Sequence, residues 1–190
     1  KNLIEIGSGN GFLTDQIVEK KPKSLILIEK DNFLFKNLKL KYRSLKFIEI
    51  INADVLKIDF NKVIKKNSII VGNLPYNISS QILIKILKFV KWPPKSSDFI
   101  FMFQKELGEK IIGKFKSENY GRLSILSNYR MSFLKKFFVS NNCFFPKPKV
   151  TSIVIHFRPF KNILFKIKNL ESLEKITNII FSNKRKMINK

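Results

Sequence analysis

Four consecutive residues, Asn73, Leu74, Pro75 and Tyr76, could together hold a planar amino group. An amine conjugated to a purine ring is a poor nucleophile, because its lone pair is delocalised into the ring. The side-chain carbonyl of Asn73 and a backbone carbonyl near Leu74 can accept its two N–H bonds, which favours a tetrahedral nitrogen with a free lone pair. Pro75 stiffens the turn, and Tyr76 can stack on the base. The segment predicts chemistry at an amino nitrogen, although Asn and Pro also favour simple turns.

A second segment, Gly7-Ser8-Gly9-Asn10-Gly11, lies between an expected strand and an expected helix. Glycines there allow a tight turn and let a ligand approach bare backbone amides. A dinucleotide-binding loop would have the form G-x-G-x-x-G, but here the third glycine comes one position early. The G-x-G-x-G form is similar to the first motif of S-adenosylmethionine-dependent methyltransferases, whose cofactor lacks a pyrophosphate. We therefore expect Gly7 and Gly9 to bind S-adenosyl-L-methionine.

Acidic residues follow the next two apolar runs. Glu29 ends the second run and can accept hydrogen bonds from both ribose hydroxyls of the cofactor. Asp54 comes just past the third run and could accept a hydrogen bond from the adenine amino group. Either acid alone could equally be a solvated turn residue, but open α/β sheets bind ligands at the carboxyl ends of strands, where both acids and the glycine loop lie. Glu5, within the first strand, could orient the loop or meet the methionine amino group indirectly.

Strands and helices alternate along most of the chain, as apolar runs and helical spacing indicate. The expected strands are 3–6, 24–28, 46–51, 68–71, 98–103, 133–139 and 152–157, and the expected helices are 12–20, 32–42, 79–89, 105–115 and 122–130. Ser79 or Ser80 is the expected N-cap of the helix at 79–89. This order predicts an α/β fold with a mostly parallel Rossmann-like sheet, in which the last two strands form an antiparallel pair.

A domain boundary is expected near Pro159, which is followed by the polar pair Lys161 and Asn162. Residues 1–160 would form the S-adenosylmethionine-dependent methyltransferase domain. Residues 161–190, with a helical pattern at 170–188, would begin a small C-terminal helical RNA-binding domain. Because the chain opens without Met and stops within a helical pattern, we expect it to be a fragment.

Composition and charge narrow the class of protein. The 190 residues are 44% hydrophobic, enough for one core, and no apolar run approaches the roughly 20 residues that cross a bilayer. The single Cys143 and the lack of a His, Cys and carboxylate cluster argue against a disulfide and a metal, so we expect a cytoplasmic protein. The net charge of +23 would attract polyanions, nucleic acid first. Since Lys far outnumbers Arg, AT-rich codons could account for part of this charge.

The chain resembles the small-subunit ribosomal RNA adenine N6,N6-dimethyltransferases over essentially its whole length. The stretches that carry the resemblance are I-E-I-G-S-G-N-G-F-L-T at 4–14, G-N-L-P-Y-N-I-S at 72–79, Q-K-E at 104–106 with Y-G-R-L-S at 120–124, and F-F-P-K-P-K-V-T-S at 144–152. The N-L-P-Y-N-I-S form separates this family from the N-P-P-Y of many DNA amino-methyltransferases and protein glutamine methyltransferases. Ser8 departs from the proline that the family typically has.

The resemblance implies that the chain dimethylates N6 of adjacent adenines in a hairpin near the 3′ end of small-subunit ribosomal RNA, during biogenesis of that subunit. It implies that Gly7, Glu29, Asp54 and Asn73 contact the cofactor or the site of the transferred methyl. It also implies that Phe144 stacks on the target adenine opposite Tyr76, although an aromatic beside a proline-rich segment could equally be part of the core. The expected partner is ribosomal RNA within the small subunit or its precursor, bound by a monomer.

Two other functions stay open at this point. A related enzyme acting on large-subunit RNA is the nearest rival, although the stretch at 144–152 favours the small subunit. A catalytically dead copy could serve as an assembly checkpoint or transcription accessory factor, but the intact motifs argue against it. We expect His156 to be a packed or edge residue, and Asn183-Lys184-Arg185-Lys186 to contact RNA phosphates or to lie on a solvated helix.

Overall fold

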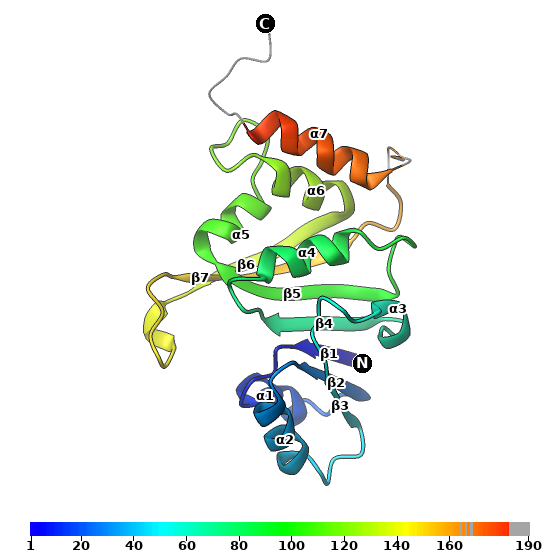
Figure 1. Ribbon diagram of the computed structural model, residues 1–190, viewed down its shortest axis with the longest axis vertical. Coiled ribbons are helices and arrows are strands. Elements are labelled where there is room, and N and C mark those ends of the chain that lie inside the picture. Colours follow the sequence, from blue (N-terminus) through cyan, green and yellow to red (C-terminus); the bar gives the residue numbers. More distant parts are fainter. Residues whose placement is uncertain (164, 166, 168, 183–190) are drawn as a thin grey trace, which may run out of the picture.

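A mixed seven-stranded sheet forms the centre of the protein, as the computed structural model shows (Figure 1). The structure describes residues 1–163, 165, 167 and 169–182. The strand order is β3-β2-β1-β4-β5-β7-β6. The strands are β1 Asn2–Ile6, β2 Ser24–Glu29, β3 Ile48–Asn52, β4 Ser68–Asn73, β5 Ser96–Gln104, β6 Met131–Val139 and β7 Ser152–Pro159. The helices are α1 Phe12–Glu19, α2 Asn32–Lys41, α3 Phe60–Val63, α4 Ser79–Leu87, α5 Lys105–Ile111, α6 Arg122–Arg130 and α7 Leu170–Ser182, with a 3₁₀ turn at Asn141–Cys143.

The pairing of the strands confirms the expected α/β architecture. Strands β1 to β5 are parallel to one another, as strands joined by crossover connections can be. Strand β7 is antiparallel to both β5 and β6, so the last two strands form the antiparallel pair that the sequence predicts. The carboxyl ends of the parallel strands therefore share one edge of the sheet.

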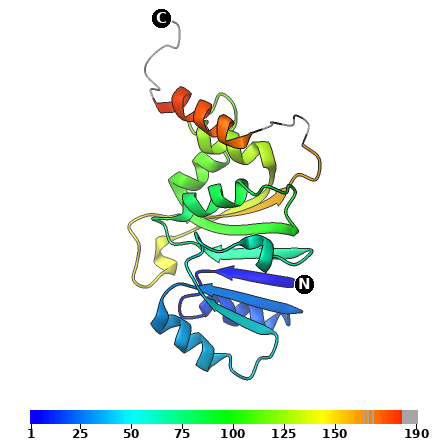
Figure 2. The same ribbon diagram turned by 45° about the vertical axis from the view of Figure 1, so that its right-hand side comes forward.

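Helices cover the sheet on both faces, and side-chain alternation along each strand sorts the residues between two cores. Leu25 and Leu27 of β2 pack with α1 and α2 in the smaller cluster. Ile26 and Ile28 of the same strand belong to the larger cluster, which also contains Phe101 of β5 and the apolar faces of α4, α5 and α6. Figure 2 shows α1 and α2 at one end of the sheet and α4 to α7 at the other.

Two local expectations need correction, and two short elements were not expected. Neither Ser79 nor Ser80 caps α4, whose N-cap is Ile78. The buried Ser79 hydroxyl instead donates to the Tyr76 carbonyl at 3.1 Å, which ties the helix to the preceding turn. The helix expected at 105–115 ends at Ile111, because the chain then turns closely at Gly113, where a Cβ would lie 2.3 Å from the Asn119 carbonyl oxygen. The sequence did not reveal α3 or the 3₁₀ turn, which are too short for periodicity.

Helix α7 lies on α6 (Figure 1). The Phe181 ring packs edge-on against Tyr120 at 6.0 Å between centroids, and Lys88 forms a 2.5 Å ion pair with Glu174. The described part of this helix ends at Ser182, so Asn183 to Lys186 lie outside the described residues. A domain boundary near residue 160 stays a prediction. None of the helices in the described part of the chain has the length and apolar character that a membrane crossing requires.

Candidate active site

The glycine loop and the Asn73 segment meet at the carboxyl edge of the parallel strands. Gly7 follows β1, and Asn73 is the last residue of the neighbouring β4. A Cβ on Gly7 would lie 3.6 Å from the Asn73 carbonyl oxygen and 3.7 Å from Cδ of Pro75. Gly7 also has a φ of +72°, a conformation that other residues rarely adopt. The structure therefore brings together the two segments that the sequence singled out for cofactor and substrate.

Glu29 holds the glycine loop in place. Its side chain is buried, and its Oε2 accepts a hydrogen bond of 2.9 Å from the backbone N–H of Gly9. Its Oε1 accepts another, also of 2.9 Å, from the N–H of Asp31, which begins the turn into α2. Each carboxylate oxygen keeps a second lone pair for a ligand hydroxyl. The sequence indicated a ligand contact at Glu29 but not this second role of shaping the loop.

Asp54 lies beyond the next strand end, with both of its carboxylate oxygens engaged. Its Oδ2 is 2.9 Å from Nζ of Lys30, and its Oδ1 accepts a 2.9 Å hydrogen bond from the N–H of Leu56. These bonds, the one from Lys30 above all, lower the pKa of Asp54 below its ordinary value. Asp54 is therefore ionised at neutral pH, as a hydrogen-bond acceptor for an amino group must be.

A buried pair lies beneath the loop. Glu5 is 1% exposed, and its Oε2 accepts a 2.6 Å hydrogen bond from the Thr14 hydroxyl on α1. Burial raises the pKa of Glu5 to about 7, and the Thr14 hydrogen bond opposes only part of that shift. Glu5 thus joins β1 to α1 across the loop, in agreement with the expectation that it orients the loop.

Tyr42 closes the loop from the other side, a role that the sequence did not reveal. Its hydroxyl donates to Oδ1 of Asp15 at 2.8 Å and lies 3.1 Å from the Gly11 carbonyl oxygen. Burial, together with Asp15, raises its pKa above the ordinary value, so the hydroxyl keeps its proton. A Cβ on Gly11 would lie 2.5 Å from the Tyr42 hydroxyl, so the third glycine is required for this contact as well as for its φ of +83°.

The loop fits an S-adenosyl-L-methionine ligand. Gly7, Gly9 and Gly11 all have positive φ, and a Cβ on Gly9 would meet no atom within 4 Å, so ligand atoms can approach bare backbone there. The buried Ser8 hydroxyl has no hydrogen-bond partner within the part of the chain that the structure describes. With the acid at the end of β2, this arrangement offers acceptors for hydroxyls and open backbone for the rest of the ligand.

A cavity of about 330 Å³ lies beside the loop, and it unites the residues expected to hold the target base. Its lining comprises Asn73, Leu74, Pro75, Tyr76, Phe144, Phe145, Pro146 and Pro148. Phe144 is half-buried and is not part of either core cluster, so it is free to face a ligand. The neighbouring Phe145 is fully exposed, and the sequence had not singled it out. Two aromatic segments from distant parts of the chain thus border one site.

Strand β7 supports the Tyr76 ring. The Tyr76 hydroxyl and the Ser152 hydroxyl are 2.6 Å apart, and Ser152 is completely buried. Ser152 directly precedes the core residue Ile153, which fixes its position. This contact limits rotation of the tyrosine side chain about the bond to its backbone. Ser152 is in a stretch that carries the family resemblance, but its partner could not be read from the sequence.

Comparison with known proteins matches the whole chain to one family. The family described as ribosomal RNA adenine dimethylase matches residues 1–190. The chain is 42% identical to ribosomal RNA small subunit methyltransferase A of Pelagibacter ubique (strain HTCC1062), over 100% of this chain and 71% of that protein. It is also 42% identical to the protein of the same name from Malacoplasma penetrans (strain HF-2), over 98% of this chain. The chain spans only 65% of this second relative.

Solved structures agree with this match. A dimethyladenosine transferase from Plasmodium falciparum superimposes with a TM-score of 0.81 at 27% identity, covering 98% of this chain and 65% of that chain. The 23S rRNA methyltransferase ErmE superimposes with a TM-score of 0.74 at 26% identity, covering 96% and 70%. Both similarities extend over the sheet and the helices on its two faces.

Proposed function

Because the chain belongs to the ribosomal RNA adenine dimethylase family, we propose that it dimethylates N6 of adjacent adenines in a hairpin near the 3′ end of small-subunit ribosomal RNA. The observation that carries the proposal is that Gly7 lies next to the Asn73 segment. A Cβ built on Gly7 would be 3.6 Å from the backbone carbonyl oxygen of Asn73. The cofactor loop and the cavity for an adenine meet there. The fold is that of the S-adenosylmethionine-dependent methyltransferases.

The cofactor contacts follow from the geometry of the loop. Gly7 and Gly9 offer bare backbone, the remaining lone pairs of Glu29 accept from the ribose hydroxyls, and Asp54 accepts from the adenine amino group. When bound, S-adenosyl-L-methionine supplies an electrophilic methyl group on a positively charged sulfur. The Ser8 hydroxyl, which has no hydrogen-bond partner among the described residues, adds one donor that the family's usual proline lacks.

The Asn73 segment then acts on the target amine. The exposed Asn73 side chain and a carbonyl near Leu74 accept the two N–H bonds of the adenine, so that its nitrogen becomes tetrahedral and its lone pair is available. After transfer the cationic nitrogen is acidic enough to lose its proton to water, so no strong base is needed. The rigid turn at Pro75 keeps these acceptors in place.

Two aromatic side chains hold the base. Tyr76 and Phe144 border the same cavity, and the Ser152 hydroxyl restrains Tyr76. Stacking of a base on an aromatic side chain contributes about 1–3 kcal/mol, enough to retain an adenine turned out of its helix. Phe145, exposed at the rim, is placed to meet a neighbouring base.

The proposed partner is ribosomal RNA in the small subunit or its precursor, and the proposed active unit is a cytoplasmic monomer. The net charge of +23 favours the approach of such a polyanion. We assign residues 161–190 to the beginning of a helical domain that contributes RNA contacts.

The test is methyl transfer from labelled S-adenosyl-L-methionine to undermethylated small and large ribosomal particles, followed by mapping of the modified adenines. The full-length wild-type protein should modify adjacent adenines in the small particle. Asn73→Ala should lose transfer and retain RNA binding, because the residue orients the amine rather than the RNA. Asn37→Ala, which changes an exposed asparagine on α2, serves as the matched control. Modification of the large particle would favour the rival large-subunit function, and no modification of either would refute the enzyme.

A further inference from the structure

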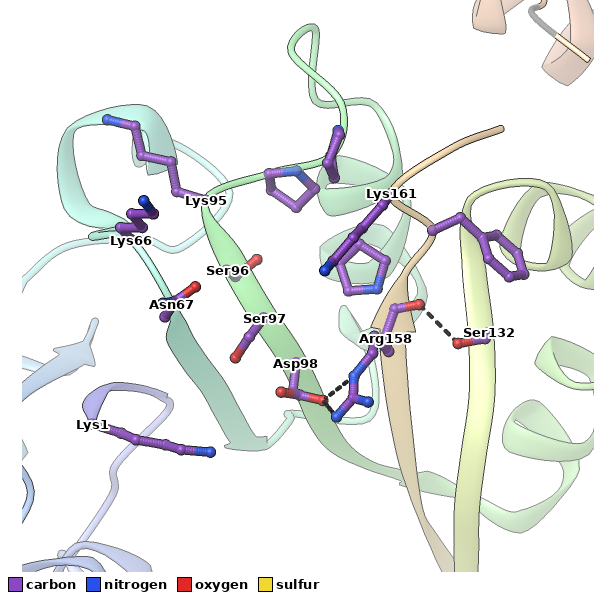
Figure 3. A pocket seen from close by; sticks show the side chains of 14 residues that line it. Lys1, Lys66, Asn67, Lys95, Ser96, Ser97, Asp98, Ser132, Arg158 and Lys161 are labelled. Atoms are coloured by element: carbon purple, nitrogen blue, oxygen red, sulfur yellow. Dashed lines mark hydrogen bonds and ion pairs between the residues drawn. The ribbon is translucent and has the colours of Figure 1, made fainter. Parts of the chain in front are cut away.

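A second, larger cavity opens at the opposite edge of the sheet, where β4 and β5 begin (Figure 3). Its volume is about 960 Å³. Five cationic side chains from different segments line it: Lys1, Lys66, Lys95, Arg158 and Lys161. We call this cavity the basic groove. The residues of the candidate active site do not line it.

The single carboxylate of the groove is already engaged. Oδ1 of Asp98 accepts hydrogen bonds from Arg158 at 2.8 and 3.0 Å, and it lies 2.8 Å from Nε2 of His156. Burial by itself would raise the pKa of Asp98, but the bonds from His156, Ser97 and Arg158 outweigh it and lower the pKa. His156 is therefore a packed residue that hydrogen-bonds to Asp98, as expected from the sequence.

In the part of the chain that the structure describes, the lysines at the rim of the basic groove are not neutralised by carboxylates. Among the described residues, Lys66, Lys95 and Lys161 form no salt bridge with a carboxylate. Each of the three is exposed. Figure 3 shows them above the Asp98–Arg158 pair, on separate segments of the chain. The groove therefore has an excess of positive charge at its rim, whereas the charges of Asp98 and Arg158 beneath the rim offset each other.

Hydrogen bonds hold these segments at a fixed spacing. The N–H of Asn67 donates to the Lys95 carbonyl at 2.8 Å, which joins the loops before β4 and β5. The Trp92 indole donates to the Phe160 carbonyl at 3.2 Å, which joins the second loop to the segment after β7. The Arg130 guanidinium stacks on Trp92 at 4.7 Å from the ring centroid and supports this link. A groove whose backbone segments are already placed loses less conformational entropy when an anion binds.

The groove also offers polar and aromatic groups that suit a nucleic acid. The buried Ser96 lines it, and within the described part of the chain its hydroxyl has no hydrogen-bond partner. Phe160 lines it with 38% of its surface exposed. Lysines along the groove suit sequence-independent contacts to the phosphates of RNA, and an exposed aromatic ring suits an unpaired base beside a stem.

We propose that the basic groove binds the phosphate backbone of the substrate RNA at a distance from the methylated adenine. That the polyanion is RNA rests on the proposed function. Asn73 pairs with Met102 on β5, six residues beyond Ser96 at the groove, so the two sites are about 20 Å apart at ~3.3 Å per residue. Phosphates about 3.4 Å apart along a strand cover that distance in about six nucleotides. One RNA stem can therefore reach both sites.

The test compares two synthetic RNA hairpins with the same loop, one with a stem of about three base pairs and one of about ten. The short stem, about 10 Å long, cannot reach the groove from the active site, whereas the long stem can. The protein is the full-length chain with Lys66→Gln, Lys95→Gln and Lys161→Gln combined. The matched control carries three other exposed lysines changed to Gln, at Lys20, Lys36 and Lys46.

Affinity is measured by fluorescence anisotropy over a range of salt concentrations. For the long stem, the groove variant should bind about tenfold more weakly, and the magnitude of its salt dependence (the slope of log K against log salt) should fall by about 2.7 for the three lost phosphate contacts. For the short stem it should bind within twofold of wild type, and the control variant should match wild type on both. Equal thermal unfolding curves establish that the variants are folded.

Several results would overturn the proposal. If the groove variant and the control variant lose equal affinity for the long stem, the binding depends on the net charge of the protein. If the groove variant also loses affinity for the short stem, the lysines act at the active site. No loss on the long stem would remove the groove as an RNA site. Tighter binding of phosphatidylserine vesicles than of RNA, abolished in the groove variant, would assign the groove to a lipid surface. The assay needs no methyl transfer, so failure of the proposed enzyme activity gives a separate result.

Discussion

Glu5 makes the folding stability of the protein depend on pH near neutrality. Its pKa rises from 4.5 to about 7 on folding, because burial disfavours the charged form. A pKa difference of one corresponds to about 1.4 kcal/mol, so ionisation of Glu5 lowers the free energy of unfolding by about 3 kcal/mol. The folded state binds the proton more tightly, so this stability is fully present below pH 4.5 and is lost as the pH rises to about 7.

Glu5→Gln removes this titration. We expect the fall in unfolding free energy between pH 4.5 and pH 8 to be about 3 kcal/mol smaller in the variant than in wild type, because the other carboxylates titrate alike in both. Urea denaturation at half-unit pH steps measures the difference. Glu118→Gln changes an exposed carboxylate and provides the control.

A second substitution tests whether the raised pKa of Glu5 causes the loss of stability. The Thr14 hydrogen bond lowers the pKa of Glu5, so Thr14→Val should move the loss of stability to higher pH. If the curves for wild type and Glu5→Gln run parallel, Glu5 is ionised throughout this range, and the argument from burial is refuted. A shift to lower pH in Thr14→Val would contradict the role assigned to that hydrogen bond.

Three further predictions follow from the packing of the site and core. Gly7→Ala adds a side chain at a φ of +72° and should weaken S-adenosyl-L-methionine binding at least tenfold by calorimetry, whereas RNA affinity is unchanged; weaker RNA binding would contradict this. Ser152→Ala and Tyr76→Phe each remove one hydroxyl of the 2.6 Å contact, so their several-fold losses in kcat/KM should not add in the double variant. Gly108→Ala places a Cβ 2.2 Å from Cγ2 of Ile153 and should cost about 1–3 kcal/mol of unfolding free energy in urea, so an unchanged denaturation midpoint would contradict the packing.

The alternation of strands and helices and the position of the glycine loop could be predicted because each depends on residues close in sequence. Apolar runs, the glycines at 7 to 11 and the acids at Glu29 and Asp54 mark successive strand ends. Parallel strands place such ends at one edge of the sheet, so the location of the candidate site followed from the pattern. The pattern did not show that Glu29 accepts the Gly9 amide, because that bond needs the loop to fold back over β2.

The sequence by itself indicated a mostly parallel α/β sheet, a glycine loop of the methyltransferase form, a candidate amine-binding segment at Asn73 and a charge suited to RNA. Only the tertiary structure decided that Phe144 borders the same cavity as Tyr76, that Ser152 restrains Tyr76, and that separate lysines form the basic groove. Local conformation depends on spacing along the chain, which a sequence displays. Contacts between distant segments depend on strand register and loop path, which only the folded chain fixes.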